Sequence, residues 1–238
     1  MGSKIKNISI RLEEICKHKI ELGLQMLGGG ASTFGWQRPP ITRLQTEPAV
    51  YGRDEDKAKI FEMVLRDEPT DANFSVITIV GMGGVGKTTL ARLVYDDEAM
   101  GIFNLRAWIC VSDDFDVLRI TEAILESITF SSSNLKDLNQ LQVRLKEAVA
   151  GKKILIVLDD VWNKNYGLWN TLKSPFMAAA SGSKIIVTTR SIDVALTIEP
   201  LEYYNLKLLS DDDCWSVFVK NVFDKKDICS RNNMELIR

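Results

Sequence analysis

The residues Gly81 to Thr89, GMGGVGKTT, carry the strongest chemical signal in the sequence. They fit the pattern G-x-x-x-x-G-K-[S/T], in which glycines let a loop curl so that successive backbone N–H groups point at phosphate oxygens. The lysine would place a positive charge on the β- and γ-phosphates, and the first threonine would offer its hydroxyl to Mg²⁺. The sequence therefore predicts a loop that binds ATP or ADP with Mg²⁺, with these candidate residues: Gly81, Gly83, Gly84, Val85, Gly86, Lys87, Thr88 and Thr89.

The same glycines also fit a second pattern, the dinucleotide fingerprint G-x-G-x-x-G, through Gly81, Gly83 and Gly86. A dinucleotide site has no need of Lys-Thr after the third glycine, and it uses an acidic residue about 20 residues further on. Here Asp113 and Asp114 come later than that. The phosphate-loop interpretation is therefore favoured over the NAD interpretation.

A second candidate follows the aliphatic run Ile154–Leu158, which ends in Asp159 and Asp160. A buried strand of this kind fixes a carboxylate at the carboxyl edge of a parallel sheet, beside the phosphate loop. Asp159 is the expected Mg²⁺ ligand, and Asp160 could polarise an attacking water.

The third candidate is Arg190, which follows the strand-like run Lys184–Thr189. An arginine at the same sheet edge could touch the γ-phosphate and report its presence. It could equally be a surface arginine at a strand end, and the pattern does not separate the two.

The element pattern from residue 49 onward alternates short β-branched runs with helical ones, which predicts an α/β fold whose parallel sheet is covered on both faces. The predicted strands are Val76–Val80, Leu105–Val111, Ile154–Leu158, Lys184–Thr189 and Tyr204–Leu208; the predicted helices are Lys87–Asp96, Val117–Thr129, Leu138–Val149 and Asp211–Phe223.

The N-terminal part reads differently. Residues 1–27 are helical in pattern, with Ile8, Leu12 and Ile15 at helical spacing, and residues 28–48, which contain Gly28-Gly29-Gly30 and Pro39-Pro40, read as a linker. The helix could pack on its own domain or be the remnant of a helical bundle, and three turns of pattern leave both open.

Composition excludes several classes of function. The formal net charge is −2, from 30 Lys+Arg and 32 Asp+Glu, which gives no bulk field to attract nucleic acid or an anionic membrane. The four cysteines are scattered and there is one histidine, so neither a structural zinc nor a disulfide framework is expected, and reduced thiols fit a cytoplasmic protein. No apolar run approaches the ~20 residues of a membrane span.

Taken together, the motifs resemble the NB-ARC domain of plant NB-LRR disease-resistance proteins. Trp162, after Asp159-Asp160-Val161, resembles the coiled-coil class of that family, and the opening segment is similar to the last helix of its coiled-coil domain. The resemblance covers roughly residues 49–223 and rests on the phosphate loop and on FNLRAWICVSDDFDV (103–117), KKILIVLDDVW (152–162), GSKIIVTTR (182–190) and LKLLSDDDCWSVF (206–218), in this order.

The resemblance implies a P-loop NTPase with a five-stranded sheet, in which the arginine strand lies between the strands of the phosphate loop and of the acidic pair. It implies that Asp159 and Thr88 hold Mg²⁺, that Asp160 assists hydrolysis, and that Arg190 senses the γ-phosphate. A segment before the phosphate loop would pack on adenine and ribose, namely Val50, Tyr51, Gly52 and Arg53.

The resemblance also implies a function. The family acts as a switch, bound to ADP at rest and to ATP when active, with at most slow ATPase activity; active oligomers signal plant defence and the hypersensitive response. The expected partners are nucleotide and further copies of this chain or related NB-LRR chains. The expected boundaries are a coiled-coil remnant at 1–27, a linker at 28–48, the nucleotide-binding domain at 49–209 and the start of the helical ARC region at 210–238. Because the chain ends before the family's Gly-Leu-Pro-Leu segment, it is expected to be truncated, with a nucleotide site open on one side.

Two alternatives stay open. The chain could be an ordinary P-loop ATPase or kinase, although no phosphoryl-acceptor pocket is visible in the pattern. It could also be an interaction fragment that binds full-length relatives and never uses nucleotide, in which case Lys87→Ala would leave partner binding unchanged.

Overall fold

The computed structural model describes residues 50–66, 73–111 and 115–223. The chain divides into two compact units, Met1–Ile41 and Thr42–Arg238, and every described residue belongs to the second. The helix predicted at 1–27, the linker predicted at 28–48 and the chain from 224 onward lie outside the described residues.

Five parallel strands form one sheet in the order β2-β3-β4-β1-β5. The predicted fold class is therefore confirmed, and so is the insertion of the arginine strand, β4, between β1 and β3. Every residue of these three central strands is buried, as their aliphatic sequences require. The strands are β1 (Phe74–Val80), β2 (Leu105–Cys110), β3 (Ile154–Asp159), β4 (Ser183–Thr189) and β5 (Glu202–Asn205).

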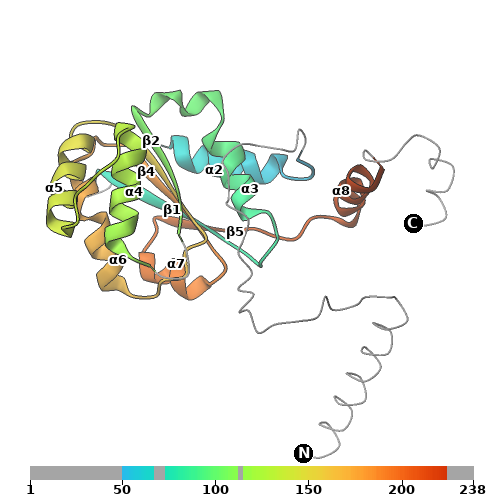
Figure 1. Cartoon of the computed structure of the whole chain (residues 1–238). Helices are drawn as coiled ribbons and strands as arrows, with labels where there is room; N and C mark the ends of the chain where they lie inside the picture. The colour runs from blue at the N-terminus through green and yellow to red at the C-terminus, as the bar shows by residue number, and fades with distance from the viewer. Residues whose placement is uncertain (1–49, 67–72, 112–114, 224–238) are drawn as a thin grey trace, which may run out of the picture. The chain divides into compact units, whose positions relative to one another are not determined.

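Helices cover both faces of the sheet, which is seen nearly edge-on in Figure 1. On one face lie α2 (Asp54–Leu65) and α3 (Lys87–Tyr95), followed by the 3₁₀ turn η1 (Glu98–Ile102). On the other lie α4 (Val117–Thr129), α5 (Leu138–Val149), α6 (Tyr166–Lys173), the 3₁₀ turn η2 (Ser174–Ala178) and α7 (Ile192–Ile198). A last helix, α8 (Asp211–Phe223), follows β5.

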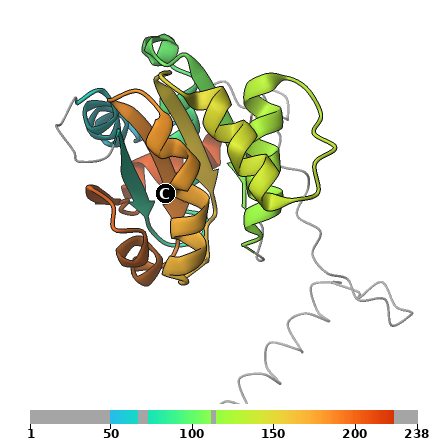
Figure 2. The same cartoon turned by 90° about the vertical axis from the view of Figure 1, so that its left-hand side faces the viewer.

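Local sequence explains where helices α4 and α5 begin and which face of each is buried. Asp116 caps α4 by accepting hydrogen bonds from the backbone N–H groups of Leu118 and Arg119. Asp137 caps α5 in the same way, through the N–H of Gln140. From these starts, apolar residues at helical spacing turn one face of each helix onto the sheet, and the two helices also pack on each other (Figure 2).

Some elements differ from the prediction. Helices α2, α6 and α7 were not predicted. The fifth strand lies at Glu202–Asn205 rather than at Tyr204–Leu208, because its pairing with β1 stops where β1 ends, at Val80. Trp108, predicted as core, is half-buried on the edge strand β2, whereas Trp169 of α6 is 1% exposed.

Candidate functional site

The phosphate loop lies between the end of β1 and the start of α3. Gly84 and Gly86 have φ values of +78° and +101°, in the left-handed region that favours glycine. Gly86 is the N-cap of α3 and has no side chain to cap it, so the N–H groups of the first helical turn receive no side-chain partner there. A loop of this shape that runs into an uncapped helix N-terminus suits a phosphate group.

Lys87, the first residue of α3, curls back over the loop. Its side chain is buried, and its Nζ donates to the carbonyl oxygens of Gly81 and Met82, both at 3.0 Å. Burial lowers the pKa of Lys87, the nearby Arg190 lowers it further, and the carboxylates of Asp160 and Asp159 oppose the shift. Two cations therefore lie close together against the loop, an arrangement that an anion would stabilise.

Asp159 ends β3 and is fully buried. The Thr88 hydroxyl lies 2.9 and 3.1 Å from its two carboxylate oxygens, and the Thr188 hydroxyl donates to Oδ1 at 2.6 Å. Burial raises the pKa of Asp159, and the hydrogen bonds from Thr188 and Thr88 oppose that shift. The two predicted Mg²⁺ ligands, Thr88 and Asp159, are thus in direct contact, and their oxygens are of the kind that Mg²⁺ prefers.

Asp160 and Arg190 meet at the same edge of the sheet. Asp160 has φ +60°, a conformation that Asp tolerates better than most residues, and its N–H donates to the Thr188 hydroxyl at 2.8 Å. Its Oδ1 lies 3.5 Å from Arg190 Nε. A Cβ added at Gly83 would lie 3.0 Å from an Nη nitrogen of Arg190, so the guanidinium rests against the phosphate loop.

Among the predicted adenine residues, Arg53 has the most contacts. Its guanidinium is 6% exposed and donates to the Val85 carbonyl at 2.6 Å, to Asp56 Oδ2 at 2.7 Å and to the Lys207 carbonyl at 3.0 Å. It thereby ties the phosphate loop to α2 and to the segment between β5 and α8. In this structure Arg53 supports the loop from behind, a role that the sequence pattern did not indicate.

Of the other three residues of that segment, Gly52 and Tyr51 lie beside α8. Gly52 has φ +63°, and a Cβ there would overlap the Asp213 carboxylate at 2.4 Å. Lys220 Nζ lies 5.6 Å from the centre of the half-buried Tyr51 ring, and Val50 is also half-buried. The segment thus meets the first turn of α8 through Gly52 and the last turn through Tyr51.

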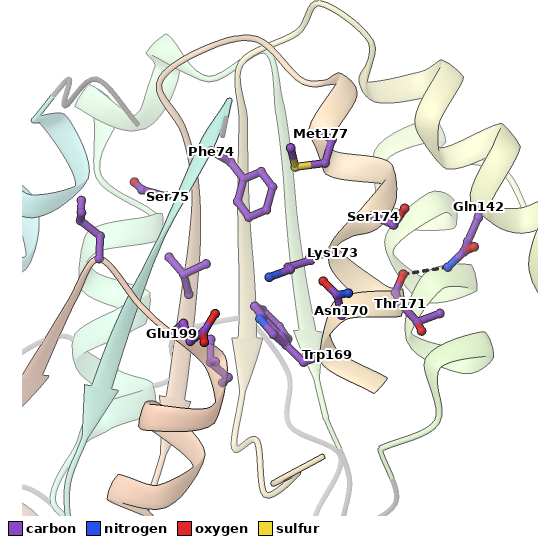
Figure 3. Close-up of a pocket in the computed structure, with 13 residues that line it drawn as sticks. Phe74, Ser75, Gln142, Trp169, Asn170, Thr171, Lys173, Ser174, Met177 and Glu199 are labelled. Atoms are coloured by element: carbon purple, nitrogen blue, oxygen red, sulfur yellow. Dashed lines mark hydrogen bonds between the residues drawn. The ribbon is translucent and has the colours of Figure 1, made fainter. Parts of the chain in front are cut away.

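A separate groove of about 790 Å³ lies at the other end of the sheet, beside the start of β1. Figure 3 shows that Phe74, Trp169 and Lys173 face it, together with Glu199 from the end of α7. None of the predicted site residues lines it. The groove is therefore distinct from the phosphate loop.

Within residues 50–66, 73–111 and 115–223, no three His, Cys, Asp or Glu side chains come together as metal ligands. Over the same ranges, no helix is both long enough and apolar enough to cross a membrane.

The structure brings the predicted phosphate, Mg²⁺ and arginine residues into one cluster. Sequence reasoning missed two members of that cluster, Trp162, whose ring lies 5.0 Å below the Arg190 guanidinium, and Thr188, whose hydroxyl joins Asp159 to Asp160. The position of Trp162 two residues after Asp160 was the available signal.

Comparison with known proteins agrees with this geometry. The NB-ARC domain family matches residues 53–228. The "Putative disease resistance RPP13-like protein 1" of Arabidopsis thaliana is 42% identical over 232 residues, covering 96% of this chain and 22% of that protein. The "Disease resistance protein RGA2" of Solanum bulbocastanum is 40% identical over 189 residues, covering 79% of this chain and 20% of that protein.

This chain thus spans about a fifth of the length of these relatives. Among solved structures, Cdc6p from Pyrobaculum aerophilum superposes with a TM-score of 0.55 at 14% identity, over 76% of this chain and 51% of that one, and shares the fold. The chain belongs to the NB-ARC family, the nucleotide-binding domain of plant disease resistance proteins.

Proposed function

We propose that this chain is the ATP/ADP-binding switch module of a plant immune receptor, in which nucleotide exchange controls self-association and defence signalling. The observation that carries the proposal is the convergence of Lys87, Asp159 and Arg190 on one sheet edge. These side chains follow three neighbouring strands, β1, β3 and β4, and they supply two cations and one buried carboxylate around an uncapped helix N-terminus.

Each residue would have a distinct task. The loop N–H groups and Lys87 would bind the phosphates, and the Lys87 ammonium would exchange its two carbonyl acceptors for phosphate oxygens. Thr88 and Asp159 would hold Mg²⁺, which when bound neutralises phosphate charge. Asp160 would orient a water near the γ-phosphate, and turnover would be slow.

The switch would depend on Arg190. The distance of 3.5 Å between Arg190 Nε and Asp160 Oδ1 is long for an ion pair, and Arg190 is partly exposed. A γ-phosphate could therefore compete for the guanidinium. ATP would draw Arg190 away from Asp160, whereas ADP would leave the pair intact. The names of the relatives, which are disease resistance proteins, support the immune setting.

The first test is the nucleotide content of the purified chain. The chain would be denatured and any released nucleotide identified by chromatography; stoichiometric ADP is expected. A chain that carries no nucleotide and fails to bind added ATP or ADP would contradict the proposal and favour the fragment that acts through protein partners alone.

The second test is Lys87→Ala. Loss of a charge-assisted contact of about 1.5–3 kcal/mol should weaken nucleotide binding by roughly 10- to 150-fold in isothermal titration calorimetry. Lys164→Ala is the matched control, because Lys164 is an exposed lysine paired with Asp193 and distant in sequence from the loop. Equal affinities for Lys87→Ala and the control, with melting temperatures near that of the wild type, would refute the phosphate-loop assignment.

A further inference from the structure

The Arg190 guanidinium lies between two residues of a single short segment, Asp160 and Trp162. Asp160 faces its Nε at 3.5 Å, and the Trp162 ring lies 5.0 Å from its central carbon, within the range of a cation–π contact. Trp162 is 40% exposed and Arg190 39%, so neither side chain is held by burial.

Hydrogen bonds fasten that segment to the strand that carries Arg190. The N–H of Val161 donates to the Thr188 carbonyl at 2.8 Å, and the Thr189 hydroxyl donates to the Val161 carbonyl at 2.7 Å. The N–H of Asp160 adds a third bond, to the Thr188 hydroxyl. The backbone immediately before Trp162 is thus fastened to the backbone immediately before Arg190, so the two side chains start from positions that are fixed relative to each other.

The orientation of the guanidinium leaves the two terminal nitrogens of Arg190 available as hydrogen-bond donors. Nε faces Asp160, and an Nη nitrogen lies near the Gly83 position of the phosphate loop. In the part of the chain that the structure describes, neither terminal nitrogen of Arg190 donates a hydrogen bond. A guanidinium that lies over the Trp162 ring and beside Asp160 has fewer accessible rotamers, so its terminal donors lose less rotational freedom when they meet an anion.

We infer that Trp162 is a positioning residue that holds Arg190 for the γ-phosphate and thereby sets how strongly the site prefers ATP over ADP. The inference rests on the proposed nucleotide function and deepens it. Because Trp162 acts through the guanidinium, its effect should appear in ATP binding and vanish when Arg190 is absent. A tryptophan that merely stabilised the fold would change the affinities for both nucleotides alike.

The experiment measures ATP and ADP dissociation constants, with Mg²⁺, for the wild-type chain and for Trp162→Ala, Trp162→Phe, Arg190→Ala and the double variant. A cation–π contact at an exposed site corresponds to about a two- to five-fold effect. Trp162→Ala should weaken ATP by that factor and ADP by less than two-fold, and Trp162→Phe should restore much of the difference. In the Arg190→Ala background, Trp162→Ala should change nothing further.

Three results would overturn the inference alone: unchanged affinities for both nucleotides in Trp162→Ala, equal losses for both nucleotides, or an undiminished effect of Trp162→Ala when Arg190 is already alanine. A wild-type chain that binds neither nucleotide would overturn the proposed function, and this inference with it. The two failures are therefore distinguishable in the same set of titrations.

Discussion

Two buried threonines on neighbouring strands offer a sharp test of how the site is held together. Thr188 on β4 and Thr78 on β1 are both fully buried. The Thr188 hydroxyl donates to Asp159 at 2.6 Å and accepts from the Asp160 N–H at 2.8 Å. The Thr78 hydroxyl has no hydrogen-bond partner within the described residues. The same change, Thr to Val, should therefore have opposite effects at the two positions.

Thr188→Val keeps the side-chain shape but removes both hydrogen bonds. The bond to the buried carboxylate is charge-assisted and contributes about 1.5–3 kcal/mol, and leaving the Asp160 N–H without a partner costs about 1–3 kcal/mol more. The expected loss in free energy of unfolding is on the order of 3–5 kcal/mol. For a domain of this size, that lowers the melting temperature by roughly 6–20 °C.

Thr78→Val instead replaces an unpaired buried hydroxyl with a methyl group. Removing the desolvation penalty of that hydroxyl should raise the free energy of unfolding by about 1 kcal/mol, or roughly 2–4 °C in melting temperature. Because the two positions share strand context, burial and residue type, this variant is the control for the substitution itself.

Both variants would be compared with the wild-type chain by calorimetry and by urea unfolding in the absence of nucleotide. The difference between them, on the order of 4–6 kcal/mol by the two preceding estimates, is the quantity of interest. If Thr188→Val were as stable as the wild type, or if Thr78→Val lost as much as Thr188→Val, the hydrogen-bonded role of Thr188 would be wrong.

Two further predictions concern hydrolysis and pH. Asp160→Asn, which keeps a residue tolerant of the +60° φ, should retain ATP but slow phosphate release by at least ten-fold in a single-turnover assay; faster release would contradict the role of Asp160. Burial and the hydrogen bond to Asp56 raise the pKa of Tyr204 from 10.0 to about 12. The folded state therefore keeps this proton when the unfolded chain releases it, so stability is fully present below pH 10 and falls as the pH rises towards 12. Tyr204→Phe should lack that fall in urea unfolding between pH 9 and 12, and identical pH profiles for variant and wild type would refute it.

The sequence predicted the central sheet well because its strands are buried on both faces. β3 is almost wholly aliphatic, and β1 and β4 combine aliphatic residues with β-branched threonines; short runs of this kind are typical of buried parallel strands. The phosphate loop was equally clear, since the fixed positions of its pattern, Gly81, Gly86, Lys87 and Thr88, each have a chemical requirement.

The missed helices had weaker local signals. Most apolar residues of α2 lie in its second half and its first turn is Asp-Glu-Asp, while α6 has a glycine in its first turn and only eight residues. These helices form because the sheet offers an apolar surface on which to pack, as the complete burial of Trp169 in α6 shows. Tertiary packing of this kind has no signature within a short window of sequence.

The site itself depends on strand order, which is a long-range property. The residues that follow β1 form the phosphate loop, and the end of β3 supplies the acidic pair Asp159 and Asp160. Arg190 follows β4, which lies between β1 and β3 in the sheet. If β4 were an edge strand, the same Thr-Thr-Arg sequence would place Arg190 beside only one of its two neighbours. Its central place lets the guanidinium contact the phosphate loop at Gly83 and the acidic segment at Asp160 together. Under the proposed function, a γ-phosphate bound by that loop would meet a residue already paired with the acidic segment, and this topology would give Arg190 a sensing role that an arginine at an edge strand would lack.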